Sequence, residues 1–293
     1  MIKNFNRSHS KVTIGNGKLQ EFRYCSLTFV GDVHEVLADS LIENNKILKY
    51  LKDNQIDNLE FIKTSVLDKL AKLVDEKGLP KKVAGYQKND GVFMNFLSFG
   101  VLEEIYDVAP LYLLQRSDVE NPKFGLDSIF FKDDEVFVFE FKSSINKLDE
   151  KAVAKNIREG VNSLFCKGDR IKTASLFDCK TNIKNNNLNS KIGEVIDNFI
   201  DNRSDALALI NQQGLKFNVC IISPNDVFSE DEIKNHIISE YIKCKKCVGE
   251  CKSIKCPSHK DIKILEAVHV QLPTEFKLEK LYEKLIARLS DGN

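Results

Sequence analysis

Residues 125–142 read GLDSIFFKDDEVFVFEFK, and this stretch decides the expected fold. Two short runs rich in aromatic and β-branched residues flank Asp133 and Asp134, a pair typical of the tight turn of a β-hairpin. If these two aspartates form the turn, counting outward along both strands pairs Asp127 with Glu140. The sequence therefore predicts a hairpin in which two carboxylates face each other.

The second strand of this hairpin is expected to have two chemically different faces. Side chains alternate along a strand, so one face carries Glu140 and Lys142 after two valines, and the other carries Phe137, Phe139 and Phe141. Opposed carboxylates about 5 Å apart repel each other, and a divalent cation is the simplest group that offsets this repulsion. A metal so held polarises a phosphoryl oxygen and lowers the pKa of a water, while the lysine orients that water or stabilises developing charge. The pattern indicates phosphodiester hydrolysis; an amphipathic hairpin with a charged, solvated face is the alternative.

A third carboxylate is expected from a helix before the hairpin. Apolar residues recur at helical spacing within residues 93–109, and Pro110 should end the segment. On the helical wheel Glu104 lies beside the apolar stripe, whereas Glu103 points toward solvent. Glu104 is therefore the predicted third acid, and the alternative that both glutamates lie on a solvated face stays open.

The order of these residues resembles the PD-(D/E)xK nuclease motif, with Leu126 where proline often stands. Gly100 lies four residues before Glu104, and a short apolar run follows at 111–114. Over residues 95–165 the pattern is similar to the HamA family, the nuclease component of Hachiman antiphage defence.

This resemblance implies an α/β, PD-(D/E)xK nuclease-like fold with a mixed central sheet flanked by helices. It implies Mg²⁺ or Mn²⁺ held by Glu104, Asp127 and Glu140, with the carbonyl of Phe141 as a further ligand and Lys142 positioning the attacking water. It also implies a DNA substrate and a helicase partner, HamB, in bacterial antiphage defence. A catalytically inactive nucleic-acid-binding or scaffold protein with this fold and a stand-alone restriction-type endonuclease remain alternatives.

Residues 147–165 are predicted to form a helix directly after the hairpin, with an apolar stripe for the core. Lys151, Lys155 and Arg158 fall on a second stripe that ends at Asn162. Because the corresponding helix of similar nucleases often borders the active site, this basic stripe is a candidate phosphate contact. The alternative is a solvated face shared with neighbouring glutamates.

Four cysteines cluster near the end of the chain. Their spacing predicts one tetrahedral zinc site, with an iron–sulfur cluster or unligated thiols as alternatives; the residues are Cys244, Cys247, Cys251 and Cys256, with His259 close behind. Other cysteines and histidines have no partner at a recognisable spacing. Cys25 and His34 are expected to be packing or surface residues, and Cys220 and His269 core residues.

The composition is that of a soluble globular protein. Of the 293 residues 42% are hydrophobic, and 43 basic residues balance 43 acidic ones, so net charge gives no argument for nucleic acid. Without a signal-peptide core or membrane-spanning run, the chain is expected to be cytoplasmic, with reduced thiols. We expect an N-terminal strand and helical region at 1–92 packed on the core, and the nuclease-like domain at 93–293 with the Cys-rich insertion at 244–259.

Overall fold

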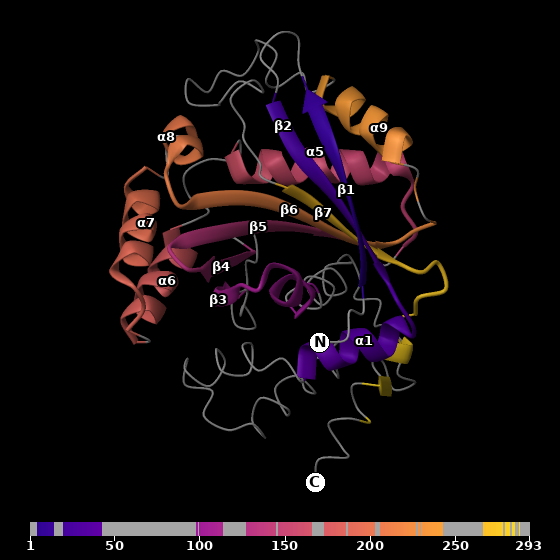
Figure 1. Ribbon diagram of the computed structural model, residues 1–293, viewed down its shortest axis with the longest axis horizontal. Coiled ribbons are helices and arrows are strands. Elements are labelled where there is room, and N and C mark those ends of the chain that lie inside the picture. The colour runs from indigo at the N-terminus through magenta and orange to yellow at the C-terminus, as the bar shows by residue number, and fades with distance from the viewer. Residues whose placement is uncertain are drawn as a thin grey trace, which may run out of the picture.

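A seven-stranded sheet forms the centre of the computed structural model, which describes residues 5–14, 20–42, 98, 100–113, 127–144, 146–165, 173–185, 187–202, 206–226, 228, 230–242, 266–277, 279–281, 283–284 and 287. The strand order is β1-β2-β7-β6-β5-β4-β3 (Figure 1). The strands are β1 (Phe5–Ile14), β2 (Gln20–Phe29), β3 (Ala109–Leu113), β4 (Ser128–Lys132), β5 (Glu135–Ser143), β6 (Leu215–Pro224) and β7 (Glu266–Leu272). Strands β5, β6, β7 and β2 run parallel, and the other pairings are antiparallel. The expected α/β class with a mixed sheet flanked by helices is confirmed.

The predicted hairpin is present as β4 and β5. Lys132 pairs with Glu135, as counted from the sequence, and the ladder continues to Ser128 opposite Phe139. Asp133 adopts a φ of 52°, a left-handed conformation that aspartate tolerates in turns. The turn therefore sets the register that brings Asp127 and Glu140 to the same end of the hairpin.

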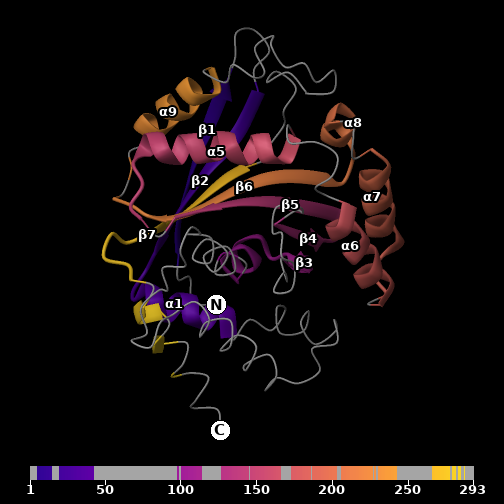
Figure 2. The same cartoon turned by 180° about the vertical axis from the view of Figure 1, so that it is seen from behind.

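The two faces of the sheet pack against different helices. The valine face of β5 joins a core with α5 (Glu150–Phe165), α6 (Thr173–Asn185), α7 (Ser190–Asp201), α8 (Ala206–Asn211) and α9 (Glu230–Ile242). The phenylalanine face of β5 joins a second core with α1 (Val33–Ile42) and the helix at 100–106. Figure 2 shows α5 and α9 on one side of the sheet and α1 on the other. The alternation predicted for β5 is therefore confirmed.

Two glycines allow helices to approach their neighbours closely. A Cβ on Gly160 would lie 2.5 Å from the side chain of Val219, so α5 rests directly on β6. A Cβ on Gly100 would lie 2.5 Å from the carbonyl oxygen of Ser40, so the helix at 100–106 rests directly on α1. Both helices border the hairpin, and larger side chains at these glycines would push them away.

The structure differs from the sequence-based expectation in two elements. The sequence predicts one strand near the N-terminus, at residues 20–30, but residues 5–29 provide two strands, β1 and β2, and both extend the sheet that contains the hairpin. The sequence of residues 166–189, with its run of asparagines, predicts a loop, but this segment contains α6. Leu176 and Cys179 are fully buried, and the Asn182 amide donates a hydrogen bond to the carbonyl of Leu111 in β3 at 2.9 Å. Tertiary packing thus stabilises a helix in an asparagine-rich segment of weak periodicity.

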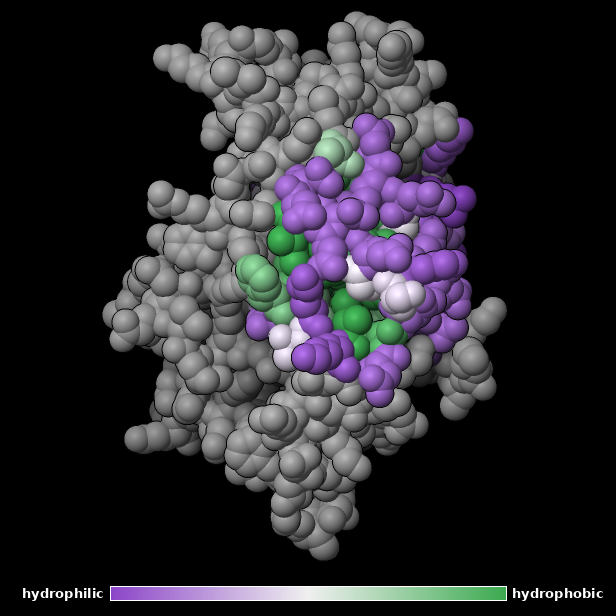
Figure 3. Space-filling model, turned by 90° about the vertical axis from the view of Figure 1, so that its left-hand side faces the viewer, coloured by the Kyte–Doolittle hydropathy of each residue, from purple (hydrophilic) through white to green (hydrophobic). Residues whose placement is uncertain are grey.

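Helices α6 and α7 lie beside the hairpin end of the sheet. Figure 3 shows this side of the molecule, where hydrophilic residues cover much of the described surface and hydrophobic residues show between them. The α7 side chains Asn189 and Lys191, at and just after its N-cap, bond to Asp134 at 2.5 and 2.7 Å. These contacts fasten the turn of the hairpin to the helical layer.

Several expected features lie outside the described residues. They are most of the N-terminal helical region, the cysteine cluster at 244–259, and Ser229, which the sequence predicts as the N-cap of a helix at 229–243. The sequence also predicts strands at 215–224 and 262–272 that extend the sheet begun by the hairpin. These strands are present as β6 and, from Glu266, as β7. In the described part of the chain, no helix combines the length and apolarity needed to cross a membrane.

Candidate active site

Asp127 lies directly before β4 and is half-buried. Its Oδ2 accepts a hydrogen bond from the backbone N–H of Phe141 in β5 at 2.7 Å. The carboxylate therefore reaches across the hairpin to the backbone beside Glu140. This contact fixes its orientation without using a side-chain partner.

Glu140 and Lys142 lie on one face of β5, as the strand period predicts. The Lys142 Nζ donates a hydrogen bond to Glu140 Oε1 at 2.6 Å. The Glu140 side chain is 11% exposed and that of Lys142 24%, so this ion pair is largely shielded from water. A charge-assisted bond in such a setting is stronger than one at the open surface.

Burial and the charge of Glu140 oppose the ionisation of Asp127. The pKa of Asp127 is raised to about 8, first because its carboxyl group is desolvated and second because of the negative charge of Glu140. The N–H of Phe141 and the charge of Lys142 lower this pKa but only in part. A cation between the carboxylates would stabilise the ionised form of Asp127 and so counteract the shift, and carboxylate oxygens are the ligands that Mg²⁺ and Mn²⁺ prefer.

Replacement of Asp127 by asparagine is expected to remove the loss of folding stability that the ionisation of Asp127 causes as pH rises. The pKa of an unfolded aspartate is about 3.9, below the folded value, so the folded chain binds more protons than the unfolded chain in the window between them. The stability of the wild type therefore falls as pH rises through this window. In EDTA, the free energy of unfolding of Asp127→Asn relative to wild type should rise by at most about 1.4 kcal/mol per pH unit.

Urea unfolding at pH values from about 4 to about 8 measures this difference. Asp201→Asn, an exposed position at the end of α7, is the matched control and should track the wild type. A difference between Asp127→Asn and wild type that stays constant across the window would contradict the raised pKa.

Glu104 does not join the acid pair in this arrangement. Glu104 is exposed and Glu103 half-buried, the reverse of the order expected from the helical wheel. Partial burial raises the pKa of Glu104, whereas the charges that shift the Asp127 pKa come from Glu140 and Lys142. Among the described residues, neither glutamate completes a three-ligand cluster with Asp127 and Glu140. The helical wheel gave the wrong order of exposure for Glu103 and Glu104 because it assumed one buried stripe. Val101 and its neighbour Leu102 are both fully buried, so the helix packs on two sides.

The basic residues expected to contact phosphate lie on α5, which starts just after β5. Asp149 caps this helix by accepting a hydrogen bond from the N–H of Ala152 at 2.7 Å. Lys151 and Lys155 are exposed, and Lys155 lies 3.9 Å from Glu159, while Arg158 is half-buried. The two lysines are therefore accessible to a polyanion. The pairing of Lys155 with Glu159 also agrees with the alternative, in which this face of the helix is a solvated surface shared with glutamates.

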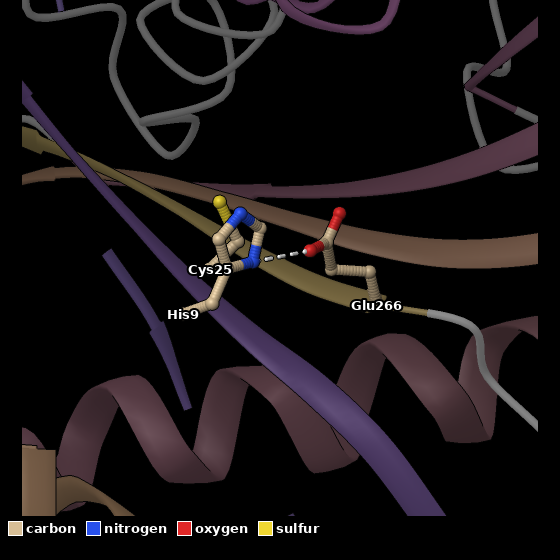
Figure 4. A group of neighbouring side chains, drawn as sticks. All are labelled: His9, Cys25 and Glu266. Carbon is tan, nitrogen blue, oxygen red and sulfur yellow. Dashed lines mark ion pairs between the residues drawn. The ribbon is translucent and has the colours of Figure 1, made fainter. Parts of the chain in front are cut away.

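A second group of side chains was missed from the sequence. His9, Cys25 and Glu266 come from β1, β2 and β7, and their potential ligand atoms all lie within 4.8 Å of one another (Figure 4). From the sequence, Cys25 is expected to be a packing or surface residue because it has no partner at a recognisable spacing. His9 and Glu266 are separated by 257 positions, so their proximity becomes visible only when the strand order is known. No local spacing in the sequence marks this group, because its members come from three strands.

Comparisons with known proteins add no relative to these observations. Neither the family models, the curated proteins nor the solved structures contain a match to this chain.

Proposed function

We propose that this protein is a divalent-metal-dependent DNA endonuclease that hydrolyses phosphodiester bonds at Asp127, Glu140 and Lys142. The observation that carries the proposal is the convergence of these three groups at one end of the hairpin. Asp127 is held by the N–H of Phe141, Lys142 bonds to Glu140, and the charge of Glu140 raises the pKa of Asp127. A strongly shifted pKa beside a specific charged neighbour is typical of functional sites.

The donor set fits Mg²⁺ or Mn²⁺. Asp127 and Glu140 offer hard carboxylate oxygens, and the resemblance adds the backbone carbonyl of Phe141 as a further oxygen ligand. When bound, such a cation polarises a phosphoryl oxygen and lowers the pKa of a bound water. The resemblance assigns the metal ligands to these residues and adds Glu104 as a third carboxylate. In the described structure Glu104 does not lie with the pair.

Lys142 supplies the hydrogen-bond donors of the site. Its ammonium group carries three N–H bonds, of which one is directed at Glu140. The remaining donors are available to orient the attacking water or to stabilise charge on the phosphate in the transition state. Glu140 keeps Lys142 at this end of β5, because the charge-assisted bond fixes an otherwise flexible side chain.

DNA as substrate and a helicase as partner rest on the resemblance to the HamA family. The exposed Lys151 and Lys155 at the start of α5 support an anionic polymer as substrate. In the proposed arrangement a HamB-like helicase restrains the nuclease in antiphage defence until it meets aberrant DNA.

Cleavage of supercoiled and linear DNA tests the proposed activity. The purified chain, tested alone and with a helicase partner if one is encoded nearby, is expected to cut DNA in Mg²⁺ or Mn²⁺, and EDTA is expected to abolish the cleavage. Absence of cleavage under all these conditions would contradict the proposed enzymatic activity and favour a protein with a nuclease fold that only binds nucleic acid.

Metal binding has a readout that does not depend on activity. A ligand at 100 times its dissociation constant stabilises a protein by about 2.7 kcal/mol, so saturating Mg²⁺ or Mn²⁺ should raise the melting temperature by several degrees. Glu140→Gln and Asp127→Asn should lose this shift. Glu135→Gln, at the other end of β5 where Glu135 bonds to Lys216 at 2.5 Å, is the matched control and should keep it. An equal shift in all variants would place the metal elsewhere.

A further inference from the structure

The cluster of His9, Cys25 and Glu266 lies on the other face of the sheet from Glu140. His9 is directly opposite Cys25 in the pairing of β1 with β2, and Cys25 pairs with Val268, two residues from Glu266 on the same face of β7. The three side chains point toward one another (Figure 4). The ladder therefore fixes an imidazole, a thiol and a carboxylate in one place.

Some buried polar atoms at this cluster lack a hydrogen-bond partner among the described residues. Glu266 Oε1 is 3.1 Å from His9 Nδ1, but the geometry is not that of a hydrogen bond, and the oxygen has no hydrogen-bond partner among the described residues. Asn218 in β6 is fully buried beside Glu266 in the strand register, and neither atom of its amide has a partner in the described part of the chain. A buried polar group without a partner costs about 1–3 kcal/mol, so such groups point to a missing ligand.

Tyr106 covers this polar region from the helix at 100–106. Its hydroxyl donates a hydrogen bond to Glu266 Oε2, and its ring lies edge-on to Phe139 with 5.7 Å between centroids. Phe139 and Glu266 are the neighbours of Asn218 on its two sides. Tyr106 therefore spans Asn218 and orients the carboxylate of Glu266.

Arg7 supplies positive charge to the cluster. Its Nε donates a hydrogen bond to Cys25 Sγ at 3.3 Å, and its Nη2 lies 3.5 Å from Glu266 Oε2. The Arg7 side chain is 35% exposed, so it is not part of the buried core. The guanidinium group thus supplies a positive charge at the position where a cation would compensate Glu266.

A cysteine nucleophile does not fit this environment, although a thiol, an imidazole and a carboxylate also occur together in cysteine hydrolases. Cys25 is fully buried, so a substrate has no access to its thiol. Reactive cysteines, in contrast, are at least partly accessible. Ligation, which displaces the thiol proton directly, is the chemistry left to Cys25.

We propose that His9, Cys25 and Glu266 bind one Zn²⁺, with a fourth position open to water beside Asn218. A mixed sulfur, nitrogen and oxygen set suits zinc among the common divalent ions. Tetrahedral zinc holds ligand atoms about 3.5 Å apart, so the cluster closes by about 1 Å from its present spacing of up to 4.8 Å. The hydrogen bond from Tyr106 is the outer contact that such a carboxylate ligand needs. This site is independent of the proposed nuclease.

Zinc content per chain tests the proposal. The full chain and its variants are loaded with Zn²⁺, exchanged into metal-free buffer and analysed by atomic spectroscopy. Because Cys244–Cys256 offers a separate zinc site, the readout is the difference from wild type. Cys25→Ala and His9→Gln should each lose one equivalent. Cys179→Ala, which truncates another fully buried cysteine in the opposite core, should lose none.

His9 is exposed on the edge strand β1, so His9→Gln keeps the fold, which circular dichroism verifies. Arg7→Gln removes the competing charge and should bind Zn²⁺ about tenfold more tightly. Wild-type zinc content in both His9→Gln and Cys25→Ala would overturn the site, and unchanged affinity in Arg7→Gln would overturn the role of Arg7 as the competitor.

Discussion

Lys142→Met is expected to lower the rate of metal-dependent DNA cleavage on the order of 10²–10³-fold. Methionine keeps the length and the apolar stem of the side chain but removes every donor and the charge. The melting-temperature shift on metal binding should survive, because Lys142 is a cation and not a ligand. A loss of rate with retained metal binding assigns the lysine to the reaction itself.

Glu140→Gln is expected to lose both cleavage and the metal-induced shift. The substitution preserves shape, but a neutral amide neither attracts the cation nor holds Lys142 by a charge-assisted bond. Lys147→Met is the matched control for Lys142→Met, since Lys147 is exposed, pairs with Asp226 and lies five residues further along the chain. Initial rates on supercoiled DNA at saturating metal give the comparison. Cleavage that survives both active-site substitutions would assign the activity to other residues or to a contaminant.

The hairpin was predictable because its information is local. Asp133 and Asp134 mark the turn, and a period of two then fixes which side chains share a face and which residues pair. The same rule placed Glu140 beside Lys142 and the phenylalanines in the opposite core. Only the contact of Asp127 with the N–H of Phe141 goes beyond it, because Asp127 lies just outside the ladder.

The order of the strands was not predictable from local pattern. β1 is an edge strand with mostly exposed side chains, so its sequence lacks the alternation of a half-buried strand; Ser10 and Val12 are the buried residues among those described from 6 to 12. The parallel pairing of β2 with β7 joins segments more than 240 residues apart. The cluster of His9, Cys25 and Glu266 depends on this pairing, which no spacing in the sequence encodes.

His269 was predicted to be a core histidine, and the structure confirms this with a complete set of partners. Its Nδ1 lies 2.7 Å from the hydroxyl of Tyr24 and its Nε2 lies 2.9 Å from Oδ1 of Asn225. Because an amide oxygen only accepts, Nε2 carries the proton and Nδ1 accepts from Tyr24. The hydroxyl of Ser223 donates to the same Asn225 oxygen at 2.7 Å. The ring centroids of Phe228 and His269 lie 5.6 Å apart. The neutral imidazole is therefore fully satisfied.

Acidification is expected to destabilise the fold through His269. Burial lowers the pKa of this fully buried side chain to about 3, against about 6.5 for a histidine in the unfolded chain. Between these values the unfolded chain binds the additional proton, so the contribution of His269 to stability is complete above about pH 6.5 and is lost as pH falls. The loss reaches at most about 1.4 kcal/mol per pH unit.

His269→Gln isolates this effect. The variant loses hydrogen bonds and should be less stable than wild type by about 1–3 kcal/mol at neutral pH. Its free energy of unfolding in urea should nevertheless depend less steeply on pH, so that the gap to wild type narrows toward pH 5. His236→Gln, which replaces a half-buried histidine in α9, should keep the wild-type slope. A gap between His269→Gln and wild type that does not change with pH would mean that the buried imidazole accepts its proton as readily as an exposed one, and the neutral network around Asn225 would then be the wrong description of this core.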